Sequence, residues 1–397
     1  MSRTVALDIH KRFAEVAVHE DGYVGRLGRV EVDELGAFAE SLRPDDHVVI
    51  ESTSQTWAVV ELIGRNVGRV TVSNPMRTRA IASAKVKTDQ IDARVLAELG
   101  AADFLPPVWT PDAETQELRR RVAHRAGLVR QRTRLRNQVH AVLARNLVTI
   151  DVSDVFGRKG RRALGEVALP GHEREQVDSA LRLHDALDTE IKLAERTLAE
   201  RALADSDVRL LMSIPGVGAM TSLAIVSVIG HVGRFPSSRE LVSYFGLDPR
   251  VRQSGDRAAR HGHISREGQA HARGLLIEAA HSAVRTPGPL RAFYQRIKAR
   301  RGTKIAICAT GRKLLTVCWQ LLSKQEPYRY EAPSGTRRKT RLLQRAAGHT
   351  DLVSLAGERD ARAIERRVLD NLQRHYEAHV AERTARDRKH VARLART

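Results

Sequence analysis

The sequence is poor in cysteine and contains no long apolar run. Only two cysteines occur in 397 residues, Cys308 and Cys318, both in one apolar segment that we expect to be helical. We therefore expect neither a disulfide nor a cysteine-based metal site. No apolar run approaches the ~18 residues of a membrane span, and the N-terminus lacks the pattern of a signal peptide. These absences predict a cytoplasmic protein without a membrane partner.

Acidic residues are also in deficit. The chain carries 67 lysines and arginines against 47 aspartates and glutamates, which gives a formal net charge of +20. This excess suits a polyanionic partner, and nucleic acid is favoured over a membrane surface. The length predicts two to four domains with ample core.

The first 110 residues have the pattern of an α/β domain. Three meandering strands precede an alternation of strands and helices, which is the order of a ribonuclease-H-like, or RuvC-like, domain. We expect strands at 3–9, 12–20 and 23–32, a helix at 35–42, a strand ending at Glu51, a helix at 57–66, a strand at 69–73 and a helix from Pro75.

Four acids stand out in this part of the chain. Asp8 lies within one apolar strand and Glu51 ends another, where a carboxylate is costly to bury unless it is paired or binds a cation. Asp89 and Asp92 are three residues apart in a helical pattern, so they share one helix face. Such a pair alone is usually an ordinary solvated helix face. As a set, the four carboxylates could hold two Mg²⁺ or Mn²⁺ ions, about 3.5–4 Å apart, for phosphoryl displacement.

Residues 111–205 predict a long helical hairpin. Helices are expected at 113–147, with coiled-coil-like spacing, and at 173–204, around a Gly- and Arg-rich linker at 157–165. This hairpin could also carry oligomer contacts. The arginines of the first helix form either a solvated basic face or a phosphate-binding surface, and we favour binding. The candidates are Arg119, Arg120, Arg125, Arg130, Arg132 and Arg136.

Residues 206–328 predict a mainly α domain. The segment Ile214-Pro215-Gly216-Val217-Gly218 resembles the turn of a helix-hairpin-helix unit, whose amides at Gly216 and Gly218 can hold a phosphate. The alternative is an ordinary glycine-terminated turn between helices, and the sequence favours binding only slightly.

A Gly- and Arg-rich loop follows, from Leu247 to Gly268. Its arginines, Arg252 and Arg257 among them, could contact nucleic acid. Ser254 lies between them, but a serine in such a loop is usually a turn residue, and composition alone does not single it out. Residues 329–397 read as a basic tail, either helical or flexible.

The ordered motifs resemble a known family. The chain is similar to insertion-sequence transposases that combine a RuvC-like "DEDD" domain with a serine-bearing C-terminal domain, the bridge-RNA-guided recombinases. The resemblance covers about residues 3–328 and rests on the segments Ala6–Lys11, Ile50–Thr53, Lys87–Ala93, Ile214–Gly218, Tyr244–Gly255, Gly262–Gly268 and Arg273–Ala280.

This resemblance implies a mechanism and a set of partners. The metal-binding acids fall on Asp8, Glu51, Asp89 and Asp92, and the serine nucleophile on Ser254. It implies metal-assisted attack of the serine on a DNA phosphate, a covalent phosphoserine intermediate, and strand exchange without hydrolysis. It also implies a prokaryotic, nucleoid-associated homo-oligomer, up to a tetramer, that shares sites between subunits. A structured guide RNA from the element would select donor and target DNA, and this expectation rests on the resemblance alone.

Two alternatives remain open from the sequence. A hydrolytic RuvC-like nuclease or junction resolvase would use the four acids and a water molecule, and would cleave DNA without Ser254. A non-catalytic nucleic-acid-binding protein would tolerate the loss of Asp8. The presence of all four acids weighs against this second alternative.

Overall fold

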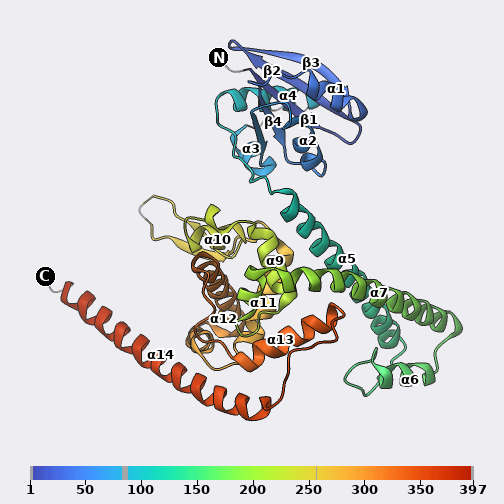
Figure 1. The fold of residues 1–397 in the computed structure, drawn as a ribbon, viewed down its shortest axis with the longest axis vertical. Coiled ribbons are helices and arrows are strands. Elements are labelled where there is room, and N and C mark those ends of the chain that lie inside the picture. Colours follow the sequence, from blue (N-terminus) through green and yellow to red (C-terminus); the bar gives the residue numbers. More distant parts are fainter. Residues whose placement is uncertain (1–2, 83–87, 256, 395–397) are drawn as a thin grey trace. The chain divides into compact units, whose positions relative to one another are not determined.

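The protein is described by a computed structural model that covers residues 3–82, 88–255 and 257–394. The chain divides into two compact units, Met1–Asp112 and Ala113–Thr397. The first is a mixed α/β unit and the second is mostly helical (Figure 1). The expected α/β N-terminal part and mainly α C-terminal part are therefore confirmed, and the finer division into four domains stays a prediction.

Some residues of the sequence motifs lie outside the described part of the chain. Lys85, Val86 and Lys87, which precede the helical acid pair, are among them. Asp256, two residues after Ser254, is another.

The elements follow the chain in a simple order. The first unit contains β1 (Thr4–Ile9), β2 (Phe13–Glu20), β3 (Tyr23–Glu31), α1 (Leu35–Glu40), β4 (His47–Glu51), α2 (Thr56–Ile63), β5 (Arg69–Ser73), α3 (Pro75–Ile81) and α4 (Asp89–Ala101). The second contains α5 (Ala113–Arg145), α6 (Arg158–Glu166), α7 (Gly171–Ala204), α8 (Ser206–Met212), α9 (Ala219–Ile229), α10 (Ser238–Tyr244), β6 (Pro249–Arg252), β7 (Arg260–Ile264), α11 (Ala270–Ala283), α12 (Pro289–Lys324), α13 (Pro333–Ala346) and α14 (Glu358–Leu394).

The first unit is a three-layer sandwich around a five-stranded sheet. The strand order is β3-β2-β1-β4-β5, with β1, β2 and β3 antiparallel and β1, β4 and β5 parallel. Alternate residues of the central strand face opposite layers. Val5 and Leu7 pack with residues of α1 and α2, whereas Ala6 packs with residues of α4.

Helix α4 lies close against the sheet because its contact face is built from small side chains. Ala93, Ala97 and Gly100 are buried there. A Cβ atom at Gly100 would lie only 2.8 Å from Cγ1 of Val49 on β4, so no larger residue fits at this crossing. The close packing brings the first turn of α4 to the carboxyl ends of β1 and β4.

Two long antiparallel helices open the second unit. Three ion pairs join α5 to α7: Arg125 with Glu195, Arg132 with Asp188, and Arg145 with Glu173. Residue numbers rise along α5 while those of the partners on α7 fall, so the two helices are antiparallel. The expected long helices are present, and their coiled-coil packing stays a prediction. The Gly- and Arg-rich stretch between them, expected as a linker, forms helix α6.

The main core of the second unit lies around α9. Its side chains pack with those of α8, α11 and α12, and also with Leu343 and Ala347 at the end of α13. The predicted tail thus contributes to the core. Cys308 and Cys318 are free thiols on α12, as expected. Burial raises the pKa of the Cys318 thiol to about 12.

Helix α12 bears on the predicted absence of a membrane partner. Among the described residues it is the one helix long and apolar enough to cross a membrane. An apolar stretch of 18 residues meets this test, and 56% of that stretch is buried inside the structure. The buried core helix of a globular domain meets the same criteria, so this is only weak evidence for a span.

Candidate active site

The sheet register places two of the predicted acids side by side. Strands β1 and β4 are parallel, and Leu7 is aligned with Ile50. The next residues, Asp8 and Glu51, therefore stand level with each other. They face the α4 layer, because Ala6, two residues before Asp8, packs in that layer.

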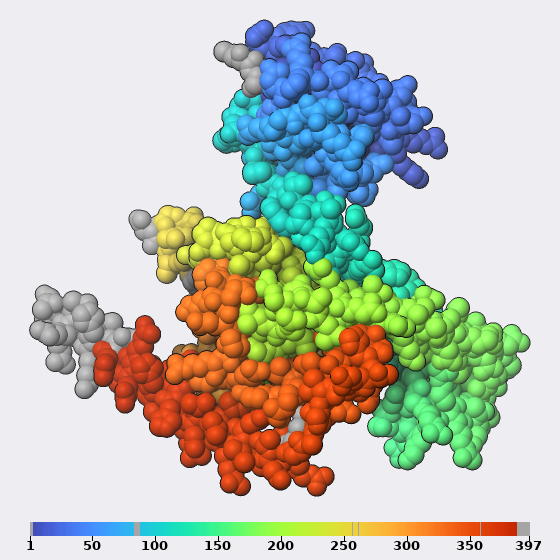
Figure 2. All heavy atoms as spheres, in the orientation of Figure 1, coloured from blue at the N-terminus to red at the C-terminus, as the bar shows by residue number. Residues whose placement is uncertain are grey.

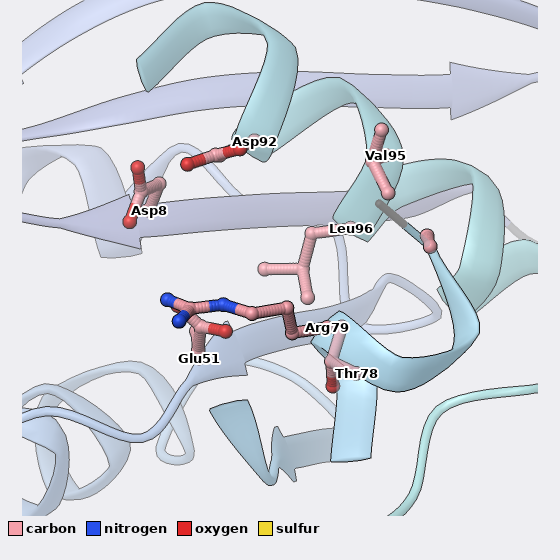
Figure 3. Close-up of a pocket in the computed structure, with 8 residues that line it drawn as sticks. Asp8, Glu51, Thr78, Arg79, Asp92, Val95 and Leu96 are labelled. Atoms are coloured by element: carbon pink, nitrogen blue, oxygen red, sulfur yellow. The ribbon is translucent and has the colours of Figure 1, made fainter. Parts of the chain in front are cut away.

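The other two acids come from the first turn of α4. The hydroxyl of Thr88 caps this helix by accepting a hydrogen bond from the amide of Ile91 (3.3 Å). Asp89 and Asp92 follow in the first turn, where the helix dipole favours negative charge. Figure 3 shows Asp92 reaching from α4 toward Asp8 on β1.

Three of the four acids line one small pocket. The pocket has a volume of about 70 Å³, and its lining includes Asp8, Glu51 and Asp92. Arg79 of α3 also lines it, with its guanidinium group beside Glu51 (Figure 3). Sequence reasoning did not single out Arg79, since one more arginine in a basic chain carries no distinguishing signal.

Asp89 is connected to Asp8 by His10, which contacts both carboxylates. Nε2 of His10 lies 3.2 Å from Oδ2 of Asp8 and 3.5 Å from Oδ2 of Asp89. One ligand atom from each of these three residues lies within 4.8 Å of the others. His10 was not predicted as a site residue. The signal was available, because His10 directly follows the strand, and continuing the strand's period of two puts it on the same side as Asp8.

The electrostatics of the site suit a divalent cation. Burial raises the pKa of Asp8, and the carboxylates of Asp92 and Asp89 raise it further, while His10 opposes the shift. Carboxylate oxygens, with at most one imidazole nitrogen, are a donor set that Mg²⁺ or Mn²⁺ accepts. A bound cation would offset the mutual repulsion of the acids. The residues present therefore fit the metal that the sequence predicts.

Ser254 lies in the second unit, on a two-stranded hairpin. The sequence predicted a loop from Leu247 to Gly268. Strands β6 and β7 pair in antiparallel register within this segment, and Ser254 lies in the connection between them, two residues after the end of β6 at Arg252. The described residues from Val251 to Arg260, including Arg252 and Arg257, are exposed. Figure 2 shows this segment, in yellow, at the surface of its unit.

The base of this hairpin is firmly anchored. The hydroxyl of Ser265 donates a hydrogen bond to Oδ1 of Asp248 (2.6 Å), and the amide of Ser265 donates to the Asp248 carbonyl (2.8 Å). Arg250 donates to the carbonyl of Ser265 (3.1 Å). The anchored strands present Ser254 outward. Its hydroxyl makes no hydrogen bond to the residues that the structure describes.

The six predicted nucleic-acid-binding arginines of α5 differ in their contacts. Arg119 donates to the carbonyls of Ser227 (2.7 Å) and Val228 (3.0 Å) at the end of α9. Three others pair with acids: Arg125 with Glu195, Arg132 with Asp188, and Arg136 with Asp154. Arg120 and Arg130 are exposed, and neither forms an ion pair with a described acid. Acidic residues of the same protein thus neutralise part of the positive charge of these arginines.

The two glycines of the predicted hairpin turn differ. Gly216 has φ +84°, and a Cβ atom there would lie 2.5 Å from the backbone nitrogen of Ala283, so packing requires this glycine. Gly218 precedes α9 with φ −104°, and apart from its two chain neighbours no described residue has a heavy atom within 4 Å of its added Cβ. Of these two glycines, only Gly218 has open space at the position of an added Cβ atom.

Comparison with known proteins places this geometry in a family context. Residues 5–146 match a family model of DEDD transposases, described as "Transposase". Residues 208–295 match the model described as "Transposase IS116/IS110/IS902 family". The two matched segments together span more than half of the chain.

Individual relatives agree with these matches. The chain is 29% identical, over 61% of its length and 68% of the relative's, to the transposase for insertion sequence element IS1111A of Coxiella burnetii. It is 28% identical, over 71% of its length and 81% of the relative's, to the pilin gene-inverting protein of Moraxella lacunata. It is also 25% identical to the transposase for insertion sequence element IS1328 of Yersinia enterocolitica, over 68% and 82% of the two chains.

Proposed function

We propose that this chain, which belongs to the IS110/IS116/IS902 family of transposases, cuts and rejoins DNA through a covalent bond to Ser254. DNA transposition is the activity of the family. The observation that supports the chemistry is the convergence of Asp8, Glu51 and Asp92 on one pocket, with Asp89 beside it.

The four acids would hold the divalent cations, Mg²⁺ or Mn²⁺. Such ions supply neutralisation of phosphate oxygens and activation of an attacking hydroxyl. The protein's own groups prepare the site. Thr88 fixes the start of α4 and thereby the direction of Asp89 and Asp92. His10 lies against Asp8 and Asp89, and so restricts both carboxylates.

Ser254 would carry the covalent step. Its Oγ forms a bond to a DNA phosphorus and loses its proton, while the bond from that phosphorus to one sugar oxygen breaks and that oxygen is protonated to a hydroxyl. A sugar hydroxyl of another strand then attacks the same phosphorus and releases the serine. The phosphodiester is conserved throughout, so the strands are rejoined without an energy source. The exposure of Ser254 on an anchored hairpin supports this role.

DNA would be held by the exposed basic residues. Arg120, Arg130, Arg252 and Arg257 are exposed and can reach phosphates, and Gly218 leaves the start of α9 open. This grip would be independent of sequence and weakened by salt. By the resemblance, base pairing with a structured RNA would supply specificity, and a homo-oligomer of up to four subunits would supply the complete set of sites.

The main alternative is a hydrolytic nuclease, since the acid pocket is built without the serine. A trapping experiment separates the two. Purified protein, Mg²⁺, RNA from the flanking non-coding end and labelled element-junction DNA are incubated and separated on a denaturing gel. We expect a DNA–protein adduct that is lost in both Ser254→Ala and Asp89→Ala. Free cleaved DNA that persists in Ser254→Ala but not in Asp89→Ala would establish hydrolysis instead.

A further inference from the structure

The turn between α8 and α9 receives a side chain from the C-terminal segment. Nζ of Lys339, on α13, donates hydrogen bonds to the carbonyls of Met212, Ile214 (3.0 Å) and Val217 (3.1 Å). Three backbone oxygens from a stretch of six residues thus converge on one ammonium group. No role for Lys339 was predicted from the sequence, because it lies among several basic residues far along the chain.

The physical reason for this contact lies in how a helix ends. The last carbonyls of α8 have no donors within the helix, and the tight turn that follows points further carbonyls in the same direction. Converging carbonyl oxygens create a negative potential that a cation neutralises. An ammonium group offers three donors for three acceptors, so the match is complete.

Neighbouring contacts tie the same turn to the same segment. The backbone amide of Tyr328 donates to the hydroxyl of Ser213 (2.9 Å), which itself donates to the carbonyl of Leu210 (2.7 Å). At the far end of α13, Leu343 and Ala347 are buried in the main core. The helix that carries Lys339 is therefore fixed at several points, and it can hold the ammonium group in place against the turn.

We propose that the ammonium of Lys339 is a built-in cation that holds the turn from Ser213 to Gly218, and that Lys339 is thereby a positioning residue for DNA contacts at Gly218. The claim that Lys339 positions DNA contacts rests on the proposed function, whereas the claim that it holds the turn concerns the protein without DNA. The segment after residue 328 then belongs to the DNA-binding apparatus although it lies outside the motifs of the family.

The test compares two neighbouring substitutions in the full chain. Lys339→Met keeps the length and packing of the side chain but removes the ammonium. Arg338→Met removes one charge from an exposed position on the same helix and is the matched control. Hydrogen exchange is measured in the DNA-free protein at the amides of Ser213, Ile214 and Val217, which are hydrogen-bonded in the turn.

We expect exchange at these amides to be at least about tenfold faster in Lys339→Met than in Arg338→Met, because hydrogen bonds to a charged group are lost. In Lys339→Ala, n-propylammonium should slow this exchange again, and the uncharged n-propanol should not. Equal exchange in Lys339→Met and Arg338→Met would overturn the cation role, and this comparison stands even if Lys339→Ala does not fold.

Affinity for a labelled DNA duplex tests the second half separately. We expect Lys339→Met to bind roughly tenfold more weakly than Arg338→Met at equal ionic strength. If exchange in the turn becomes faster but affinity does not change, Lys339 holds the turn, and its role in positioning DNA contacts is refuted.

Discussion

The imidazole of His10 lies 3.2 Å, from Nε2 to Oδ2, from the carboxylate of Asp8. Asp8 lies near the end of β1, and His10 is the first residue after this strand. An imidazole beside grouped carboxylates offsets their repulsion only in its protonated form. A divalent cation does so at any pH at which the acids are ionised. A bound divalent cation would therefore offset the repulsion among these acids.

The first prediction concerns the stability of the metal-free protein. Because the folded protein raises the pKa of Asp8 above its ordinary 3.8, the resulting stabilisation is complete below that value and is lost as pH rises through the raised value. In chelator at neutral pH, Asp8→Asn should melt at a higher temperature than the wild type. Adding Mg²⁺ should raise the melting temperature of the wild type more than that of Asp8→Asn. Asp33→Asn, at an exposed acid, should follow the wild type, and an equal Mg²⁺ effect in all three would argue against the site.

A second prediction concerns Asp92, on α4, and the rate of adduct formation. Asp92→Asn should lower the rate of adduct formation at least about a hundredfold, since even outer-shell partners of metal ligands cost 10–100-fold. Glu98→Gln on the same helix should have little effect, because Glu98 is exposed and pairs with Arg94 at the surface. Normal adduct formation by Asp92→Asn would remove this acid from the proposed metal set.

A third prediction separates two adjacent arginines. Arg119→Met should lower the free energy of unfolding by about 1.5–3 kcal/mol, as hydrogen bonds from a charged group to the end of α9 are lost. Arg120→Met should leave stability unchanged. It should instead weaken DNA binding and reduce the slope of log affinity against log salt by about 1. Urea denaturation and salt titrations check both, and reversed phenotypes would contradict the assignment.

A fourth prediction separates the two glycines of the turn. Gly216→Ala should destabilise the second unit by more than about 1 kcal/mol, because the positive φ and the backbone of α11 leave no room for Cβ. Gly218→Ala should fold normally. Gly218→Glu should also fold but bind DNA more weakly, since a carboxylate would repel an approaching phosphate. If Gly218→Glu binds like the wild type, the turn does not contact DNA.

The sequence by itself determined the elements of the first unit and the position of its acids. Local patterns suffice for this, because the alternation in β1 and the spacing of Asp89 and Asp92 depend on nearest neighbours in the chain. Thr88 before two acids likewise marks a helix start. The same local rules placed Ser254 in a loop but missed the short strands β6 and β7 on either side of it, and they missed α6.

Only the tertiary structure decided which groups meet. The alignment of Leu7 with Ile50 sets Asp8 beside Glu51, and the close packing at Gly100 brings Asp92 to them. Likewise, Lys339 reaches the carbonyl of Val217 from 122 residues away in the chain. Such contacts arise from strand pairing and core packing between distant segments, and no local periodicity encodes them.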